Sequence, residues 1–245
     1  MKKIKLLENF EPYDPYELMI TPPNKKAEMI ISEIMKKDKA NLNLVSDLIV
    51  LGANVDWQDN YGLATLHWCA KWNHSRIAKI LIDAGADVNI QDNDGWTALH
   101  WCAMYNRPEI ARMLLDAGAD MSILNNIGRT ALHMCASYNH PEIARMLLDA
   151  GADVNIQDIY DSTALHCCAY WNSTEIARML LDAGADMSIL NNFGSTVLHY
   201  GARDNRPEIA KMLLDAGADK TIQDTDGILP YELAESKELK ELLTP

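Results

Sequence analysis

The sequence lacks the features of membrane-spanning and secreted proteins. No apolar run approaches the roughly 18 residues that cross a bilayer. The opening stretch MKKIKLLENF has the basic residues of a signal peptide, but its apolar part, Ile4 to Leu7, is short and interrupted by Lys5. We therefore expect an intracellular protein, cytoplasmic or nuclear.

Basic residues are too few to neutralise the chain. There are 22 Lys and Arg against 35 Asp and Glu, which gives a formal net charge of −13. No basic cluster follows one face long enough to track phosphates. Nucleic acid and anionic membrane surfaces are therefore not the expected partners.

The cysteines do not form a disulfide framework. Their number, five, is odd, and four of them recur at one position of a 33-residue period: Cys69, Cys102, Cys135 and Cys168. Helices packed side by side lie about 8–10 Å apart, which exceeds the roughly 7 Å limit on the Cα separation of a disulfide. We expect reduced, buried thiols.

A repeat organises most of the chain. The stretch Gly85 to Ala117, GADVNIQDNDGWTALHWCAMYNRPEIARMLLDA, returns with changes at Gly118, Gly151 and Gly184, and a looser copy starts at Gly52. A period of 33 residues carrying T-x-L-H-x-x-A resembles the ankyrin repeat. The resemblance implies an all-α ankyrin-repeat solenoid, in which each repeat is a helix-turn-helix with a β-turn loop.

The repeat boundaries follow from the period. We predict five full repeats between two degenerate capping repeats, after an N-terminal tail: tail 1–23, N-terminal cap 24–51, repeats 52–84, 85–117, 118–150, 151–183 and 184–216, and C-terminal cap 217–245. The first cap needs a polar outer face, and its charged residues are expected to supply one: Lys25, Lys26, Glu28, Glu33, Lys36 and Lys37.

Within a repeat, each local signal has a physical reason. Asp92 to Gly95 has the composition of a type I turn. Thr97 is placed to cap the first helix by accepting a helix amide, Asn106 to end it in the left-handed conformation, and Pro108 to open the second helix.

Two departures from the pattern predict local differences. Asp161 replaces the turn glycine, so the loop at 158–162 is expected to differ in shape and to expose Tyr160 differently. Gly201 replaces the repeated cysteine and should loosen its helix by up to about 1 kcal/mol.

The histidines and cysteines do not predict chemistry. The resemblance implies that the repeated histidine bridges the turns by hydrogen bonds: His67, His100, His133, His166 and His199. Zinc needs three or four ligands about 2.0–2.3 Å from one point, whereas like residues stand a repeat apart. With no phosphate loop and no carboxylate pair in a predicted cleft, we expect no metal, no cofactor and no catalytic residues.

The resemblance also implies where partners bind. In the family, turn residues beside the glycine and the last residues of the first helix line the concave side. Here these positions hold Tyr61, Leu63, Trp72, Asp94, Trp96, Met104, Tyr105, Ile127, Arg129, Tyr138, Tyr160, Tyr170, Trp171, Phe193 and Arg203. Exposed Trp and Tyr with some Arg have the composition of an interface core. Trp68 and Trp101 lie one step further in and are assigned to the core.

These residues predict a non-catalytic protein–protein interaction module that is a monomer and binds a partner protein through the concave surface. Two alternatives remain. The chain is a stable repeat scaffold, natural or engineered, without a dedicated partner. Or it is the substrate of an asparaginyl hydroxylase, because Asn89 and Asn155 occupy the position that such enzymes modify in similar repeats.

Overall fold

The computed structural model describes residues 15–36 and 40–245. Most of the predicted tail, residues 1–14, and Lys37 of the predicted cap lie outside this range. By its internal contacts the chain divides into two units, 1–120 and 121–245. Apart from an isolated bridge between Gln58 and Ala64, the described residues form helices, turns and loops but no strand.

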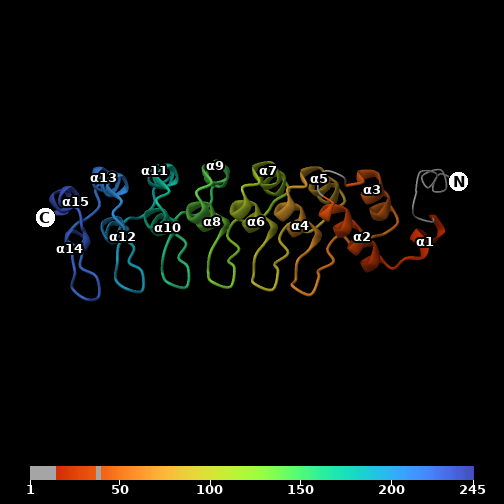
Figure 1. Ribbon diagram of the computed structural model, residues 1–245, viewed down its shortest axis with the longest axis horizontal. Coiled ribbons are helices and arrows are strands. Elements are labelled where there is room, and N and C mark those ends of the chain that lie inside the picture. Colours follow the sequence, from red (N-terminus) through yellow and green to blue (C-terminus); the bar gives the residue numbers. More distant parts are fainter. Residues whose placement is uncertain (1–14, 37–39) are drawn as a thin grey trace. The chain divides into compact units, whose positions relative to one another are not determined.

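The first unit consists of helical hairpins in two layers (Figure 1). Its described residues form α1 (Pro15–Ile20), α2 (Pro23–Met35), α3 (Leu42–Val50), α4 (Thr65–Trp72), α5 (Ser75–Asp83), α6 (Ala98–Tyr105) and α7 (Pro108–Asp116). The inner helices α2, α4 and α6 pack in sequence, and the outer helices α3, α5 and α7 pack beside them. The loops that precede α4 and α6 project away from both layers.

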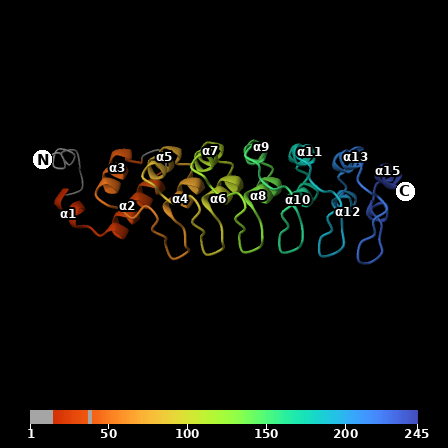
Figure 2. The same ribbon diagram turned by 180° about the vertical axis from the view of Figure 1, so that it is seen from behind.

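The second unit repeats this arrangement, and the two layers are also visible from behind (Figure 2). Its helices are α8 (Ala131–Tyr138), α9 (Pro141–Asp149), α10 (Ala164–Trp171), α11 (Thr174–Asp182), α12 (Val197–Arg203), α13 (Pro207–Asp215), α14 (Pro230–Leu233) and α15 (Lys237–Leu243). The inner layer contains α8, α10, α12 and α14, and the outer layer contains α9, α11, α13 and α15.

Tight turns form the tips of the projecting loops. In the second repeat the Gly95 amide donates to the Asp92 carbonyl at 2.9 Å, and Asp92 Oδ1 accepts the amides of Asp94 and Trp96. Adjacent loops are joined through their backbones, since the amide of Asn93 donates to the carbonyl of Tyr61 at 3.0 Å. The turn residues thus determine the shape of each loop, and the backbone hydrogen bond holds the adjacent loop against it.

A histidine fastens the start of four inner helices, α4, α8, α10 and α12, to the next loop. In α10, His166 Nε2 donates to the carbonyl of Ser195 at 3.3 Å, so Nδ1 is the acceptor and lies 3.0 Å from the Thr163 hydroxyl. Thr97 occupies the N-cap of α6, as predicted, and forms a capping box with His100. The Thr97 amide donates to His100 Nδ1 at 3.2 Å, and the Thr97 hydroxyl lies 2.9 Å from the same nitrogen.

Asparagine ends four inner helices in the left-handed conformation, as predicted. The φ angles are 61°, 54°, 57° and 62° at Asn73, Asn106, Asn139 and Asn172. The residue that follows often reaches back to the preceding repeat. Arg107 Nε donates to the carbonyl of Ala70 at 3.2 Å, and Ser173 Oγ donates to that of Ala136 at 2.6 Å. These bonds satisfy carbonyls that the helix end leaves unpaired.

The capping helix α2 differs from the prediction at two charged residues. Lys26 and Glu33 were expected on the outer face, but both are buried. Lys26 Nζ donates to the carbonyl of Leu51 at 2.7 Å, and Glu33 accepts the amide of Asn41 at 2.8 Å and pairs with Lys36. Each buried charge therefore has partners, which burial requires, and they hold the hairpin of α2 and α3 together.

The two departures from the repeat pattern change the fold little. Asp161 adopts the left-handed conformation of the glycine it replaces, with φ of 55°. Its amide still donates to Asp158 at 2.8 Å, so the expected change of loop shape does not occur. Gly201 lies in α12, and a Cβ added there would meet atoms of Ala210 at 3.7 Å, an ordinary contact.

Candidate protein-binding surface

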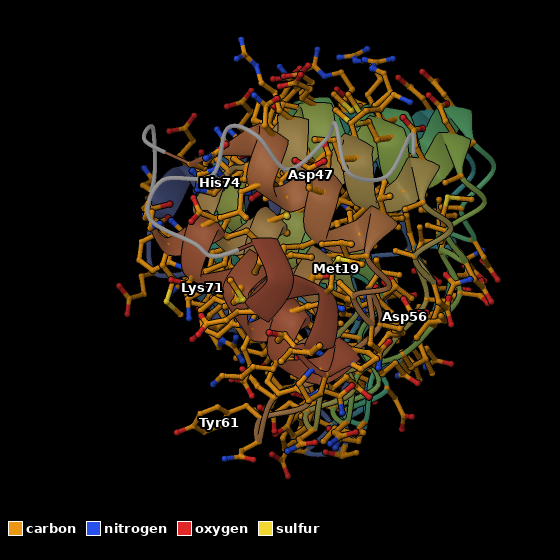
Figure 3. The ribbon with its side chains drawn as sticks, turned by 90° about the vertical axis from the view of Figure 1, so that its right-hand side faces the viewer. Met19, Asp47, Asp56, Tyr61, Lys71 and His74 are labelled. Atoms are coloured by element: carbon orange, nitrogen blue, oxygen red, sulfur yellow. The ribbon has the colours of Figure 1, made fainter. Side chains whose placement is uncertain are left out.

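Two positions in each repeat present side chains that the fold does not use. One is the residue before or after the turn glycine, at the loop tip, and the other is the last turn of the inner helix. Figure 3 shows this in the first unit, where Tyr61 at the loop tip and Lys71 near the end of α4 lie on one side and Asp56 on the other. Tyr61 is 75% exposed.

The first-unit aromatic patch consists of Trp68, Trp96, Trp101 and Tyr105, and the Trp101 ring contacts those of Trp96 and Tyr105. Trp96 and Trp101 meet edge to face at 6.4 Å, and Tyr105 stacks on Trp101 at 5.7 Å. Trp101 Nε1 donates to Asp92 Oδ2 at 3.0 Å. Lys71 Nζ lies 5.0 Å from the Trp68 ring and 5.4 Å from the Trp101 ring. The assignment of Trp68 and Trp101 to the core is therefore incomplete, since both are half-buried.

The second-unit aromatic patch contains Tyr160, Tyr170, Trp171, Phe193 and Tyr200. Tyr170 meets Trp171 edge to face at 4.8 Å and Tyr200 at 6.3 Å. The first four of these side chains are between 44% and 59% exposed. Rings of this size at half exposure are the residue types that dominate interface energetics.

Two arginines border the second-unit patch, each beside an aspartate. Arg129 Nε donates to Asp158 Oδ2 at 2.9 Å. Arg203 Nε and Nη2 donate to the two carboxylate oxygens of Asp204 at 3.2 and 3.0 Å. The Arg203 guanidinium also lies 4.4 Å from the centre of the Tyr200 ring. The guanidinium planes are thus held in place before any ligand binds.

The remaining predicted residues divide by exposure. Asp94 is exposed, Met104 is half-buried, and Ile127 and Tyr138 are 38% and 46% exposed. Leu63 is 7% exposed, so it belongs to the core and leaves the candidate surface. Trp72 is 40% exposed and lines a separate hollow of about 560 Å³ beside Ala40 and His74.

Comparison with known proteins identifies the fold. The family model described as ankyrin repeats in three copies matches residues 33–125 and 157–224, and the single ankyrin-repeat model matches residues 127–159. The chain belongs to the ankyrin-repeat family. A search of the curated proteins finds no match to the ankyrin repeats of this chain.

Solved ankyrin-repeat structures agree with this assignment. Significant matches number 652 chains, among them the crystal structure of the ankyrin repeat domain of Bcl-3, described as a unique member of the IkappaB protein family. That domain is 26% identical to this chain with a TM-score of 0.78, and the match covers 92% of this chain and 99% of that one. The chain therefore has the fold of a protein-interaction module. No helix in the described ranges is long and apolar enough to cross a membrane.

The cysteine thiols and the repeated histidines lie inside the protein, where burial favours the neutral form of a side chain. All five cysteines are free and buried, and burial raises the pKa of Cys135 and Cys167. Burial lowers the pKa of His166 to about 4, so its imidazole is neutral. Within residues 15–36 and 40–245, no three His, Cys, Asp or Glu side chains are grouped as metal ligands would be.

The two asparagines proposed for hydroxylation join neighbouring repeats. Asn89 Oδ1 accepts the amide of Asp120 at 2.8 Å, and Asn155 Oδ1 accepts that of Asp186 at 2.9 Å. Both are half-buried. An enzyme that modifies them has to displace these bonds first.

Tyr200 is a surface residue that the sequence prediction missed. It follows the repeated histidine, as Trp68 and Trp101 do; the prediction assigned those two tryptophans to the core and gave Tyr200 no role. In the structure Tyr200 contacts both Tyr170 and Arg203. Three aromatic residues at one repeat position were the signal in the sequence.

Proposed function

We propose that this ankyrin-repeat chain is a non-catalytic module that binds a partner protein through its two aromatic patches. The observation that carries the proposal is the row of half-exposed aromatic side chains at repeated positions of both units. Hydrogen bonds or ring contacts hold Trp96, Trp101, Tyr105, Tyr170, Trp171 and Tyr200 in place. Ordering of these six side chains therefore costs little conformational entropy on binding. A specific contact of this kind buries roughly 800 Å² on each partner.

The surroundings of the reactive groups support a non-catalytic role. A cysteine nucleophile needs an accessible thiolate, and burial raises the pKa of Cys167. A general base needs a free imidazole nitrogen, whereas both ring nitrogens of His166 are engaged by Thr163 and Ser195. The likeness to an IkappaB-family ankyrin domain also supports protein binding.

Affinity capture from a cell lysate tests the proposal. The wild-type chain is compared with a variant that carries Tyr160→Ala, Trp171→Ala and Phe193→Ala, and bound proteins are identified by mass spectrometry. A matched control carries Leu124→Ala and Leu190→Ala, which remove apolar side chains of 42% and 43% exposure outside the patches. We expect a protein that the wild type and the control retain and that the triple variant loses. Equal retention by all three moves the site elsewhere.

A scaffold without a dedicated partner is the second candidate. The stretch PEIARMLLDAGAD occurs at residues 108–120 and again at 141–153, and such uniformity is typical of an array kept for stability. Capture of no protein by the wild type favours this candidate.

Modification by an asparaginyl hydroxylase is an independent proposal. It rests on the position of Asn89 and Asn155 in the repeat. Incubation with such an enzyme, followed by peptide mass spectrometry, is expected to show one added oxygen on either residue. An unchanged mass dismisses it.

A further inference from the structure

The second-unit aromatic patch surrounds a hollow of about 380 Å³, which falls within the usual range of ligand pockets. We call it the aromatic hollow. Its walls are Tyr160, Tyr170, Trp171, Phe193 and Tyr200. The inner helices α10 and α12 provide three of these rings, and the preceding loop tips provide the other two. A hollow of this volume has room for one large side chain of a partner.

The floor of the aromatic hollow offers neither charge nor an unpaired imidazole nitrogen. It includes His166 and Cys167, both buried. His166 is neutral and uses both ring nitrogens in hydrogen bonds within the repeat. Burial raises the pKa of the Cys167 thiol, which therefore stays protonated. A polar group placed against His166 and Cys167 would lose its water without a charge or a free ring nitrogen to replace it. This part of the floor therefore favours an apolar group, and Ser162 adds one neutral residue with a hydroxyl to the lining.

The rim of the aromatic hollow has the opposite character. Arg129 and Arg203 line it and form what we call the arginine rim. In both ion pairs the cation is the more exposed partner. The Arg129 side chain is 24% exposed and that of Asp158 is 0%, and the corresponding values are 46% for Arg203 and 22% for Asp204. The arginine rim therefore presents more guanidinium than carboxylate to a ligand, although the whole chain is acidic.

We infer that the aromatic hollow takes a large apolar side chain of the partner protein, with a carboxylate of the same partner segment on the arginine rim. Guanidinium groups bind carboxylates through charge-assisted, directional hydrogen bonds. Asp204 and the Tyr200 ring orient the Arg203 guanidinium before binding, which reduces the entropy lost. The inference rests on the proposed function and names its partner chemistry as an acidic segment with an aromatic or large aliphatic anchor.

Three indole probes of different charge test the inference. Indole-3-propionate is an anion, N-acetyltryptophanamide is neutral and tryptamine is a cation. Each is titrated into the full chain while NMR follows the backbone amides of Phe193 and Gly194. We expect saturable shifts for the anion, with a Kd about 3–10-fold below that of the neutral probe, and the weakest binding for the cation.

Variants assign the two contributions. Arg203→Gln is expected to bring the Kd of the anion to within about twofold of the neutral probe without changing the latter. Arg178→Gln removes the same charge from an exposed position of α11 and should leave the preference intact. Trp171→Ala is expected to weaken the anionic and the neutral probe at least about fivefold. Circular dichroism and thermal unfolding verify that each variant is folded.

The outcomes separate this inference from the proposed function. A preference for tryptamine, an absence of saturable shifts, or an unchanged preference in Arg203→Gln overturns the inference. If the triple variant still loses a captured protein, the proposed function then stands alone. If the anion binds as expected but no captured protein depends on the patches, the proposed function fails. The aromatic hollow would then bind an apolar anion that does not come from a partner protein.

Discussion

Two glycine substitutions separate backbone strain from contact between neighbouring loops. Gly128 and Gly151 both have positive φ, 74° and 85°, so replacement by alanine strains both by roughly 1–2 kcal/mol. Their surroundings differ. A Cβ on Gly151 would meet nothing within 4 Å, whereas one on Gly128 would lie 2.8 Å from the Ile159 amide nitrogen and 3.0 Å from the Asp158 Cα.

The difference in stability follows from what has to move. At Gly128 the obstructing atoms are backbone, so the next loop has to shift. The bond from the Ile159 amide to the Ile127 carbonyl, 3.1 Å long, lies at this contact. Overpacking of this kind costs about 1–3 kcal/mol, and a lost backbone hydrogen bond adds about 0.5–1.5 kcal/mol. We expect Gly128→Ala to lower the free energy of unfolding by about 2–4 kcal/mol more than Gly151→Ala does.

Urea unfolding followed by circular dichroism measures both variants against the wild type. The transition midpoints give the order, and the slopes show whether the array still unfolds as one cooperative unit. Equal destabilisation by the two substitutions would refute the claim that contact between loops contributes beyond backbone strain. A larger effect of Gly151→Ala would contradict the loop geometry itself.

Three further substitutions or conditions test the second unit. Gly201→Ala places a Cβ in ordinary contact with Ala210 and is expected to raise the free energy of unfolding in urea by about 0.5–1 kcal/mol; a decrease would show that the added methyl group does not fit beside Ala210. Tyr200→Phe removes the hydroxyl that accepts a hydrogen bond from the buried Asn191 Nδ2 at 2.8 Å. We expect this substitution to lower the free energy of unfolding by about 1–2 kcal/mol in the same assay. An unchanged urea midpoint would contradict a stabilising role of this bond. Burial lowers the pKa of His166 to about 4 from its ordinary value. The neutral imidazole therefore stabilises the fold fully above about pH 6.5, and this stabilisation is lost as the pH falls towards 4. The stability difference between wild type and His166→Gln should shrink over that window, and a constant difference argues against the shift.

The fold could be predicted because repeated local signals agree with each other. The turn at Asp92, the left-handed Asn106 and the first-turn Pro108 are each strong local signals, and the 33-residue period repeats most of them. The proline recurs at Pro141 and Pro207, while Ser75 and Thr174 stand in its place in the other two full repeats. Even Asp161, which breaks the glycine rule, keeps the loop shape because aspartate tolerates the left-handed conformation.

Burial at the chain's first cap could not be predicted in the same way. The helical period places Lys26 and Glu33 on a face, but the degenerate sequence of the cap lacks the repeat motif that would show what covers that face. In the structure they bond to Leu51 and Asn41. Leu63 was misplaced because the prediction treated both residues that flank Gly62 as exposed, whereas Tyr61 is 75% exposed and Leu63 is buried.

The candidate surface was predictable by position but not by contact. The sequence indicates that Tyr170 and Trp171 end an inner helix, and it does not indicate that they share a hollow with Tyr200. The residue at the repeat position of Tyr200 also decides whether a buried amide nitrogen is paired. The Tyr200 hydroxyl accepts a hydrogen bond from Asn191 Nδ2. Two repeats earlier Met134 occupies that position, and Asn125 Nδ2 is buried without a hydrogen-bond partner in the described structure.

The measurement that tests the central claim most directly is the affinity of a captured partner for single variants. Isothermal titration calorimetry compares the wild type with Trp171→Ala, Phe193→Ala and the control Leu190→Ala. We expect Trp171→Ala to raise the Kd about 30-fold or more, as at an interface hot spot of about 2 kcal/mol, while Leu190→Ala stays within about twofold. Values within about twofold of the wild type for both patch variants would contradict the claim that the aromatic patches bind the partner.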